Sequence, residues 1–394
     1  MRWSILGKLI RKGQLTVIAA NGEQRQFGQG QPSVAVEFLD PRCFGDILRN
    51  PPMNFGQTYV EGRWRPAQGS DLYAVLRLLR LNFEQSQTRG NWSLLTQSVQ
   101  AFLNSWNSVV ASRRNVAHHY DQDETLIRAC FDRDMHYSCA YFEDPATDLE
   151  SAQHAKCEHI ARKLRLQPGQ RVLDIGCGWG SLALHLAEHH QVHVTGLTLS
   201  VEQLRVAKDR AFERGLADKV DFQLQDYRLN NNSYDRVVSV GMFEHVGKAA
   251  YQKFFACVDQ ALGDEGIALI HNIANQRRAG VVNPWIRQNI FPGGHIPSAG
   301  QVIPAIEATG LVVADLECWR SHYALTLAEW HSRFNAQRSA FAQEYGESFC
   351  RLWEFYLLIC QTAFEVGHLA VHHWQLVKGE PAQLPITRDY LYRS

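Results

Sequence analysis

Apolar positions follow short, simple patterns in the first third of this chain. Some apolar runs have the alternation and β-branched content of strands, and others recur with the spacing of a helix face. The predicted elements are strands at 15–20 and 33–38 and helices at 72–79 and 92–109. A polar stretch at 112–123, rich in Arg, Asn, His and Asp, predicts a connection between domains. We therefore expect a small α+β N-terminal domain at 1–112 and a second domain at 113–394.

The pattern changes after residue 149, where apolar strands and amphipathic helices alternate. The predicted helices are 152–164, 182–189 and 201–214, and the predicted strands are 171–175, 193–197, 220–224, 236–240 and 267–270. Strands that alternate with helices are typical of a parallel, doubly wound sheet. The expected fold class is therefore α/β, with a Rossmann-like sheet in the second domain.

Two apolar stretches bear on membranes. The stretch 355–371 is interrupted by Gln361, Glu365 and His368, so it predicts a buried helix and no membrane span. Near the start, one helical face carries Trp3, Ile5, Leu6, Leu9 and Ile10, and Lys8, Arg11 and Lys12 lie elsewhere on the helix. Such a segment either lies in the interface of an anionic bilayer or packs on its own domain.

Charge and cysteine content argue against three classes: nucleic-acid-binding, disulfide-rich and metal-binding proteins. Forty basic and forty acidic residues give no net charge, so nothing in the overall charge favours nucleic acid as a partner. The nine cysteines are scattered, without a CxxC pair. This pattern favours a reducing, cytoplasmic setting and argues against a disulfide framework or a metal site.

The sharpest motif runs from Asp174 to Gly180 and follows the first strand of the predicted sheet. Its three glycines, Gly176, Gly178 and Gly180, allow a tight turn and a close approach of the backbone to a ligand. Ser181 stands where a nicotinamide fingerprint would have glycine, so a dehydrogenase is disfavoured. A purely structural turn is the other interpretation of this loop.

The loop resembles that of class I S-adenosylmethionine methyltransferases, and further motifs resemble the cyclopropane fatty acid synthase family, which includes mycolic acid cyclopropane synthases. These motifs stand in family order at 119–121, 137–142, 176–180, 196–200, 225–228, 243–247, 291–294 and 322–327. The resemblance implies transfer of a methylene group from S-adenosylmethionine to the double bond of an unsaturated phospholipid at a membrane surface. It also implies a cytoplasmic enzyme at the inner face of the membrane, and a homodimer.

The resemblance also assigns roles to residues. The cofactor-binding residues that it implies are Tyr137, Ser138, Asp174, Gly176, Gly178, Gly180, Thr198, Gln203, Asp226 and Tyr227. For the base it points to a bound bicarbonate, held by Glu244, His271, Tyr323 and the backbone at Cys139 and Ile273. A thiol nucleophile at Cys139 is not needed, because the reaction has no covalent enzyme intermediate.

Three alternatives remain. A related enzyme could methylate the acyl chain without closing the ring. A lipid-binding protein could retain a methyltransferase fold that no longer catalyses. A methyltransferase for a small molecule is the third alternative, which the N-terminal domain and the late aromatic helices disfavour.

Overall fold

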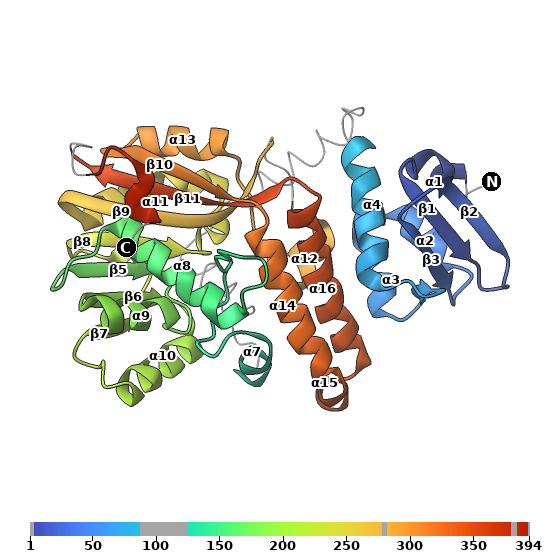
Figure 1. The fold of residues 1–394 in the computed structure, drawn as a ribbon, viewed down its shortest axis with the longest axis horizontal. Coiled ribbons are helices and arrows are strands. Elements are labelled where there is room, and N and C mark those ends of the chain that lie inside the picture. The colour runs from blue at the N-terminus through green and yellow to red at the C-terminus, as the bar shows by residue number, and fades with distance from the viewer. Residues whose placement is uncertain (1–3, 87–123, 278–281, 380–383, 393–394) are drawn as a thin grey trace. The chain divides into compact units, whose positions relative to one another are not determined.

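The computed structural model describes residues 4–86, 124–277, 282–379 and 384–392. The chain divides into two compact units (Figure 1). The first unit comprises the described parts of 1–99, 281–292 and 324–369, and the second those of 100–280, 293–323 and 370–394. The predicted helix 92–109, the predicted connection 112–123 with its domain boundary, and the motif 119–121 lie outside the described residues.

The first unit contains a four-stranded sheet with the strand order β2-β1-β3-β4. Its strands are β1 (Gly13–Ile18), β2 (Gln24–Gln29), β3 (Ser33–Phe38) and β4 (Trp64–Ala67). Strand 33–38 is confirmed at its predicted bounds, and the strand predicted at 15–20 begins and ends two residues earlier. Its helices are α1 (Ser4–Leu9), α2 (Cys43–Arg49), α3 (Pro51–Val60), α4 (Leu72–Ser86), α12 (Pro284–Asn289), α14 (His322–Ala336), α15 (Arg338–Tyr345) and α16 (Glu347–Glu365). The first two residues of α14 belong to the second unit.

The prediction of one buried helix over 355–371 is wrong at its end. Helix α16 stops at Glu365, and Val371 belongs to strand β11 (Leu369–Lys378). Gly367 lies between them, packed so tightly that a Cβ there would lie 2.4 Å from the carbonyl oxygen of Ala363. Strand β11 is buried on both faces, so its sequence lacks the alternation that distinguishes a half-exposed strand from a helix.

The second unit is built on a seven-stranded sheet with the order β10-β11-β9-β8-β5-β6-β7. The strands are β5 (Arg171–Ile175), β6 (His193–Thr198), β7 (Val220–Leu224), β8 (Tyr234–Val240), β9 (Leu262–Asn275), β10 (Leu311–Trp319) and β11. The parallel pairs are β5–β6, β5–β8, β6–β7 and β8–β9. Strand β10 pairs antiparallel with β11. The predicted α/β fold with a doubly wound sheet is confirmed.

Helices cover both faces of this sheet (Figure 1). They are α8 (Leu149–Leu164), α9 (Ser181–His190), α10 (Val201–Glu213), α11 (Tyr251–Ala261) and α13 (Ala299–Glu307). Helix α7 (Glu124–Cys130) also belongs to this unit. Val172 packs in one apolar cluster with α8, α9 and α10, and Leu173 packs in another with α11 and α13. Neighbouring strand residues point to opposite faces, so the sheet separates two cores.

Parallel pairing brings the carboxyl ends of β5, β6, β7 and β8 to one edge, where ligands bind in doubly wound sheets. His271 was expected at the end of its strand, but β9 continues to Asn275. His271 pairs with Val240, the last residue of β8, so it still lies level with this edge. Among the described residues, no helix combines the length and the apolar character needed to span a bilayer.

Candidate active site

The glycine loop joins β5 to α9 in a conformation that favours glycine. Gly176, Gly178 and Gly180 have φ angles of +83°, +54° and +81°. A Cβ on Gly176 would lie 2.8 Å from Met242, and one on Gly180 would lie 2.6 Å from Phe222. A Cβ on Gly178 would have only the Nε2 of Gln203 nearby, at 4.0 Å. The chain itself therefore excludes side chains at the first and third glycines, whereas the second leaves open space that a ligand can use.

Asp174, at the end of β5, has an unsatisfied carboxylate oxygen. Asp174 is 2% exposed, and its Oδ2 has no hydrogen-bond partner among the described residues. Burial raises the pKa of Asp174 to about 7, and the positive charge of Lys156 opposes this rise. A buried acceptor without a donor fits a ligand that brings an amino group, such as the methionine end of S-adenosylmethionine.

Two further predicted cofactor residues, Thr198 at the end of β6 and Gln203 in the first turn of α10, lie in contact. The hydroxyl of Thr198 donates to Oε1 of Gln203 at 3.0 Å, and the side chain of Ser200 caps the helix through the backbone N–H of Gln203. With Oε1 occupied, the amide nitrogen of Gln203 faces the space beside Gly178. These contacts orient a donor toward the open side of the glycine loop.

The predicted adenine-side residues follow β7. Asp226 is buried, and Arg228 donates to both of its carboxylate oxygens, at 2.8 and 2.6 Å. The ring of Tyr227 packs edge-on against Phe254, at 5.4 Å between centroids. An acidic side chain and an aromatic ring thus lie next to one another at the carboxyl edge of the sheet.

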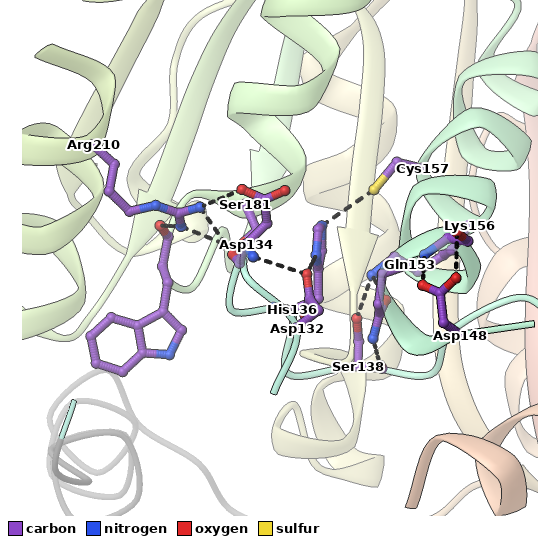
Figure 2. Close-up of polar contacts among 12 residues, drawn as sticks. Asp132, Asp134, His136, Ser138, Asp148, Gln153, Lys156, Cys157, Ser181 and Arg210 are labelled. Carbon is purple, nitrogen blue, oxygen red and sulfur yellow. Dashed lines mark hydrogen bonds and ion pairs between the residues drawn. The ribbon is translucent and has the colours of Figure 1, made fainter. Parts of the chain in front are cut away.

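Helix α8 holds the segment around Ser138 (Figure 2), which is flanked in the sequence by Tyr137 and Cys139. The buried amino group of Lys156 donates to the Ser138 hydroxyl at 3.0 Å and to Oε1 of Gln153 at 2.6 Å. Gln153 in turn donates to the backbone carbonyl of Ser138 at 3.0 Å. The Lys156 charge also shifts the pKa values of Asp174 and His271, so this amine lies close to residues predicted for both the cofactor and the base.

A second buried network fixes the start of the same segment. The His136 ring contacts the Asp132 carboxylate at 2.8 Å through Nδ1 and the Cys157 sulfur at 3.3 Å through Nε2 (Figure 2). Burial lowers the pKa of His136 to about 4 and raises that of Cys157 to about 12. A neutral imidazole beside a protonated, fully buried thiol indicates a structural role and no nucleophile.

Glu244 and Ile273 lie in direct contact. The backbone N–H of Ile273 donates to Oε1 of Glu244, and Oε2 has no partner among the described residues. Glu244 is 8% exposed, and burial raises its pKa to about 7. The vacant oxygen fits a ligand that donates a proton, as the hydroxyl of bicarbonate does. The Ile273 N–H, predicted to face the anion, is occupied by Glu244.

His271 pairs with a second histidine that the sequence did not single out. Nδ1 of His271 lies 2.8 Å from Nε2 of His373, and both rings are fully buried. Burial lowers the pKa values of both well below the usual range, so both are neutral. Nδ1 of His373 is buried without a partner. If His373 donates from Nε2, this Nδ1 is an unpaired acceptor. If His373 accepts at Nε2, Nδ1 carries an unpaired N–H, which is the costlier of the two. The favoured tautomer gives His271 a proton on Nε2, which can donate to an anion.

Cys139 and Tyr323 complete the predicted set. Cys139 is fully buried, and its thiol donates to the carbonyl of Ala140 at 3.3 Å, in keeping with a packing role. Tyr323 is half-buried and follows His322, whose Nδ1 accepts from the backbone N–H of Phe142 at 3.1 Å. The start of α14 is therefore bound to the irregular segment that contains Cys139.

Three residues of these networks were not predicted from the sequence: Lys156, Gln153 and His373. Lys156 and Gln153 fall three positions apart on the face of α8 that also carries Ala152, Cys157 and Ile160, all buried. A lysine and a glutamine within a buried helix face are rare, so this pattern was a usable signal. His373 follows from no local pattern, because its partner is 102 positions away in the sequence.

The raised pKa of Glu244 predicts a pH dependence of stability in the absence of ligands. Its folded-state pKa of about 7 exceeds the ordinary 4.5, so the folded state binds this proton more tightly than the unfolded state. The contribution is complete below about pH 4.5 and is lost as the pH rises to about 7 and above. We expect the parent to lose about 3 kcal/mol more than Glu244→Gln between pH 4.5 and pH 8 in urea unfolding. An equal loss in parent and variant would contradict the assignment, and Glu213→Gln, at an exposed position, is the control.

Comparison with known proteins agrees with this geometry. The sequence model of the mycolic acid cyclopropane synthetase family matches residues 107–374. The cyclopropane-fatty-acyl-phospholipid synthase of Escherichia coli K12 is 38% identical over 348 residues, which cover 88% of each chain. A probable fatty acid methyltransferase of Pseudomonas putida is 38% identical over 384 residues, 95% of each chain. The solved structure of the mycolic acid cyclopropane synthase CmaA1, complexed with SAH and CTAB, matches with a TM-score of 0.64 at 31% identity, over 68% of this chain and 98% of that one.

The family match covers most of the second unit, including the glycine loop, Glu244, His271 and Tyr323. The relatives from Escherichia coli and Pseudomonas putida extend the similarity through most of the chain. This chain belongs to the mycolic acid cyclopropane synthetase family.

Proposed function

We propose that this chain transfers a methylene group from S-adenosylmethionine to the cis double bond of an unsaturated phospholipid acyl chain and closes a cyclopropane ring. The observation that carries the proposal is one sheet edge with two buried, unsatisfied carboxylate oxygens, on Asp174 and Glu244. The first lies beside the glycine loop, and the second is Oε2 of Glu244, whose other oxygen, Oε1, accepts from the Ile273 N–H. The similarity to the phospholipid synthase of Escherichia coli supplies the substrate class.

The cofactor supplies an electrophilic methyl group on a sulfonium sulfur. Asp174 and Ser138 face its methionine end, Gly176, Gly178 and Gly180 shape the loop, and Tyr137 covers it. Thr198 and Gln203 serve the ribose, and Asp226 and Tyr227 the adenine. The vacant Oδ2 of Asp174 and the open space beside Gly178 support this assignment.

The alkene forms a bond to the methyl carbon while the carbon–sulfur bond breaks, which leaves positive charge on the other olefinic carbon. Ring closure then requires a base that takes a proton from the new methyl group as the second carbon–carbon bond forms. The residues around the site can exclude water, which would otherwise trap the cation as an alcohol. No residue of the site needs to form a covalent bond to the substrate.

We further propose that bicarbonate is that base when bound, held by Glu244, His271 and Tyr323 with the backbone at Cys139, and that the backbone of Ile273 acts through Glu244. Glu244 accepts the bicarbonate proton at its vacant Oε2, and the Ile273 N–H fixes the carboxylate in place. His271 donates from Nε2 in the tautomer that His373 favours. A carboxylate beside an anion is stabilising only if the anion brings a proton, and bicarbonate does.

Expression of the chain in a bacterial host that lacks cyclopropane lipids tests the product. We expect unsaturated phospholipid esters to be converted into esters one CH₂ heavier, without an olefinic proton signal. The alternative is methylation without ring closure, favoured by the similarity to the fatty acid methyltransferase of Pseudomonas putida. It would give an open-chain product with a methyl branch or a methylene group, and so would contradict ring closure.

The enzyme would act from the inner, anionic face of the membrane, and the N-terminal segment supports this. Helix α1 exposes Ile5, which is 51% exposed, and Lys8, Arg11 and Lys12 are exposed beside it, whereas Ile10 is buried against its own domain. A basic segment with an exposed apolar residue is attracted to anionic lipid. The homodimer implied by the resemblance stays a prediction.

Neutralising these three charges is expected to weaken binding to anionic vesicles by about 100-fold, because each contributes about 1 kcal/mol near the surface. The change is Lys8→Gln with Arg11→Gln and Lys12→Gln, and vesicle flotation is the measurement. The matched control is a triple variant at exposed positions of the second unit: Lys208→Gln, Lys248→Gln and Lys253→Gln. Equal loss in both triple variants would remove the special role of the N-terminal segment.

A further inference from the structure

Three histidines gather on the surfaces of two packed helices, away from the residues assigned to catalysis. His154 lies on α8, and His185 and His189 lie four positions apart on α9. One potential ligand atom from each of the three lies within 4.8 Å of the others. His154 and His189 are exposed, and neither has a hydrogen-bond or ion-pair partner in the described part of the chain.

The ring separations match the geometry of a tetrahedral metal site. Zinc–nitrogen bonds of 2.0–2.1 Å place the ring centres of bound imidazoles about 5 Å apart. The observed centroid separations are 5.0 Å for His154–His185, 5.7 Å for His154–His189 and 4.5 Å for His185–His189. Only small side-chain rotations are therefore needed to bring the three rings onto one ion.

A carboxylate supports the central ring. Oε1 of Glu158 lies 2.8 Å from Nε2 of His185 and 3.1 Å from Nε2 of His190. When Nε2 of His185 donates to Glu158, the lone pair of His185 is on Nδ1 and is available to a metal. A carboxylate that accepts from the second nitrogen of a ligating histidine is the usual support in zinc sites. Glu158, His185 and His190 form an alternative group, but its ligand atoms already bond to each other.

We propose that His154, His185 and His189 bind one divalent transition-metal ion, best matched by Zn²⁺, with Glu158 orienting His185 and water in the fourth position. The ion would join α8, which holds Ser138 through Lys156, to the carboxyl-terminal end of α9, which follows the glycine loop. Its role is to clamp two helices that support the cofactor loop.

The test is calorimetric titration of the full chain, purified without a histidine tag, with Zn²⁺. A Cys318→Ser background removes the exposed thiol. We expect one ion per chain and a rise of several degrees in the melting temperature. His154→Gln with His189→Gln should weaken binding at least 100-fold, and both positions are exposed, so the fold should tolerate the change. Glu158→Gln should weaken it about 10- to 100-fold.

Two controls separate this site from its neighbours. His193→Gln, at an exposed position on β6, should leave zinc affinity unchanged, and His190→Gln should change it by no more than a few fold. Full affinity in the double variant, or loss of binding in His190→Gln alone, would overturn the three-histidine assignment. The absence of saturable binding to the parent would overturn the site itself.

Discussion

Replacing Glu244 with glutamine is expected to lower turnover by about 10²- to 10⁴-fold, the usual effect of removing a positioned acid–base group. When the glutamine oxygen accepts from the Ile273 N–H, the amide NH₂, a donor, occupies the vacant position. Bicarbonate would then lose the acceptor for its proton. Affinity for S-adenosylmethionine should stay within a few fold, because the glycine loop and Asp174 are unchanged.

A purely structural role for Glu244 predicts different effects of Glu244→Gln on stability and on turnover. Loss of a structural carboxylate would lower stability and would reduce activity only through the folded fraction. We expect Glu244→Gln to be at least as stable as the parent at pH 8, because it removes a buried charge whose pKa is raised to about 7. If Glu244→Gln without bicarbonate turned over as fast as the parent does with bicarbonate, the assignment of the base would be refuted.

The second large effect is expected at Gly178. Gly178→Val places a branched side chain in the open space beside the Nε2 of Gln203, which is the space assigned to the cofactor. We expect affinity for S-adenosylmethionine, measured by calorimetry, to fall by at least 100-fold. Gly176 and Gly180 are poorer test positions, because a side chain there would collide with Met242 and Phe222 whether or not a ligand is bound.

Gly215 provides a matched control for this experiment. Its φ of +65° resembles the +54° of Gly178, and a Cβ there would meet nothing within 4 Å. Gly215→Val therefore carries similar backbone strain at a position after α10, outside the glycine loop. It should bind the cofactor as the parent does. Equal affinity of the Gly178 and Gly215 variants would count against a cofactor at the loop.

Much of the fold could be predicted because most strands of the second unit are bounded by turn residues and followed by amphipathic helices. Strands 171–175 and 220–224 match their predicted bounds. Strand β9 is longer than predicted at both ends, and the exposed residues near its start, Asp264 and Glu265, show no apolar pattern. The antiparallel pair of β10 and β11 was missed, because pairing between segments about sixty positions apart leaves no local signal.

The candidate site was predicted as a set of positions and not as a set of contacts. The strand-end rule places Asp174 and Glu244 at one edge, which the parallel pairing of β5 and β8 confirms. The rule does not reveal that the Ile273 N–H is used by Glu244, or that His373 sets the tautomer of His271. Both contacts depend on side-chain packing between strands.

The proposed zinc site departs from the expectation of no metal. That expectation rested on the spacing of the cysteines, which excludes the common cysteine-based patterns. The histidines at 154, 185 and 189 come from two helices, and only the packing of α8 against α9 brings them together.

Ring closure by this chain can be tested through the fate of the transferred methyl group. The full chain would be incubated with vesicles of an unsaturated phospholipid and S-adenosylmethionine carrying a fully deuterated methyl group, and the fatty esters analysed by mass spectrometry and proton NMR. Ring closure removes one deuteron from that methyl group, so we expect a product that retains two deuterons and carries both former olefinic protons on ring carbons. A product that retains all three deuterons, as an alcohol formed with water or a methyl-branched alkene does, would contradict ring closure, and so would an open-chain methylene product.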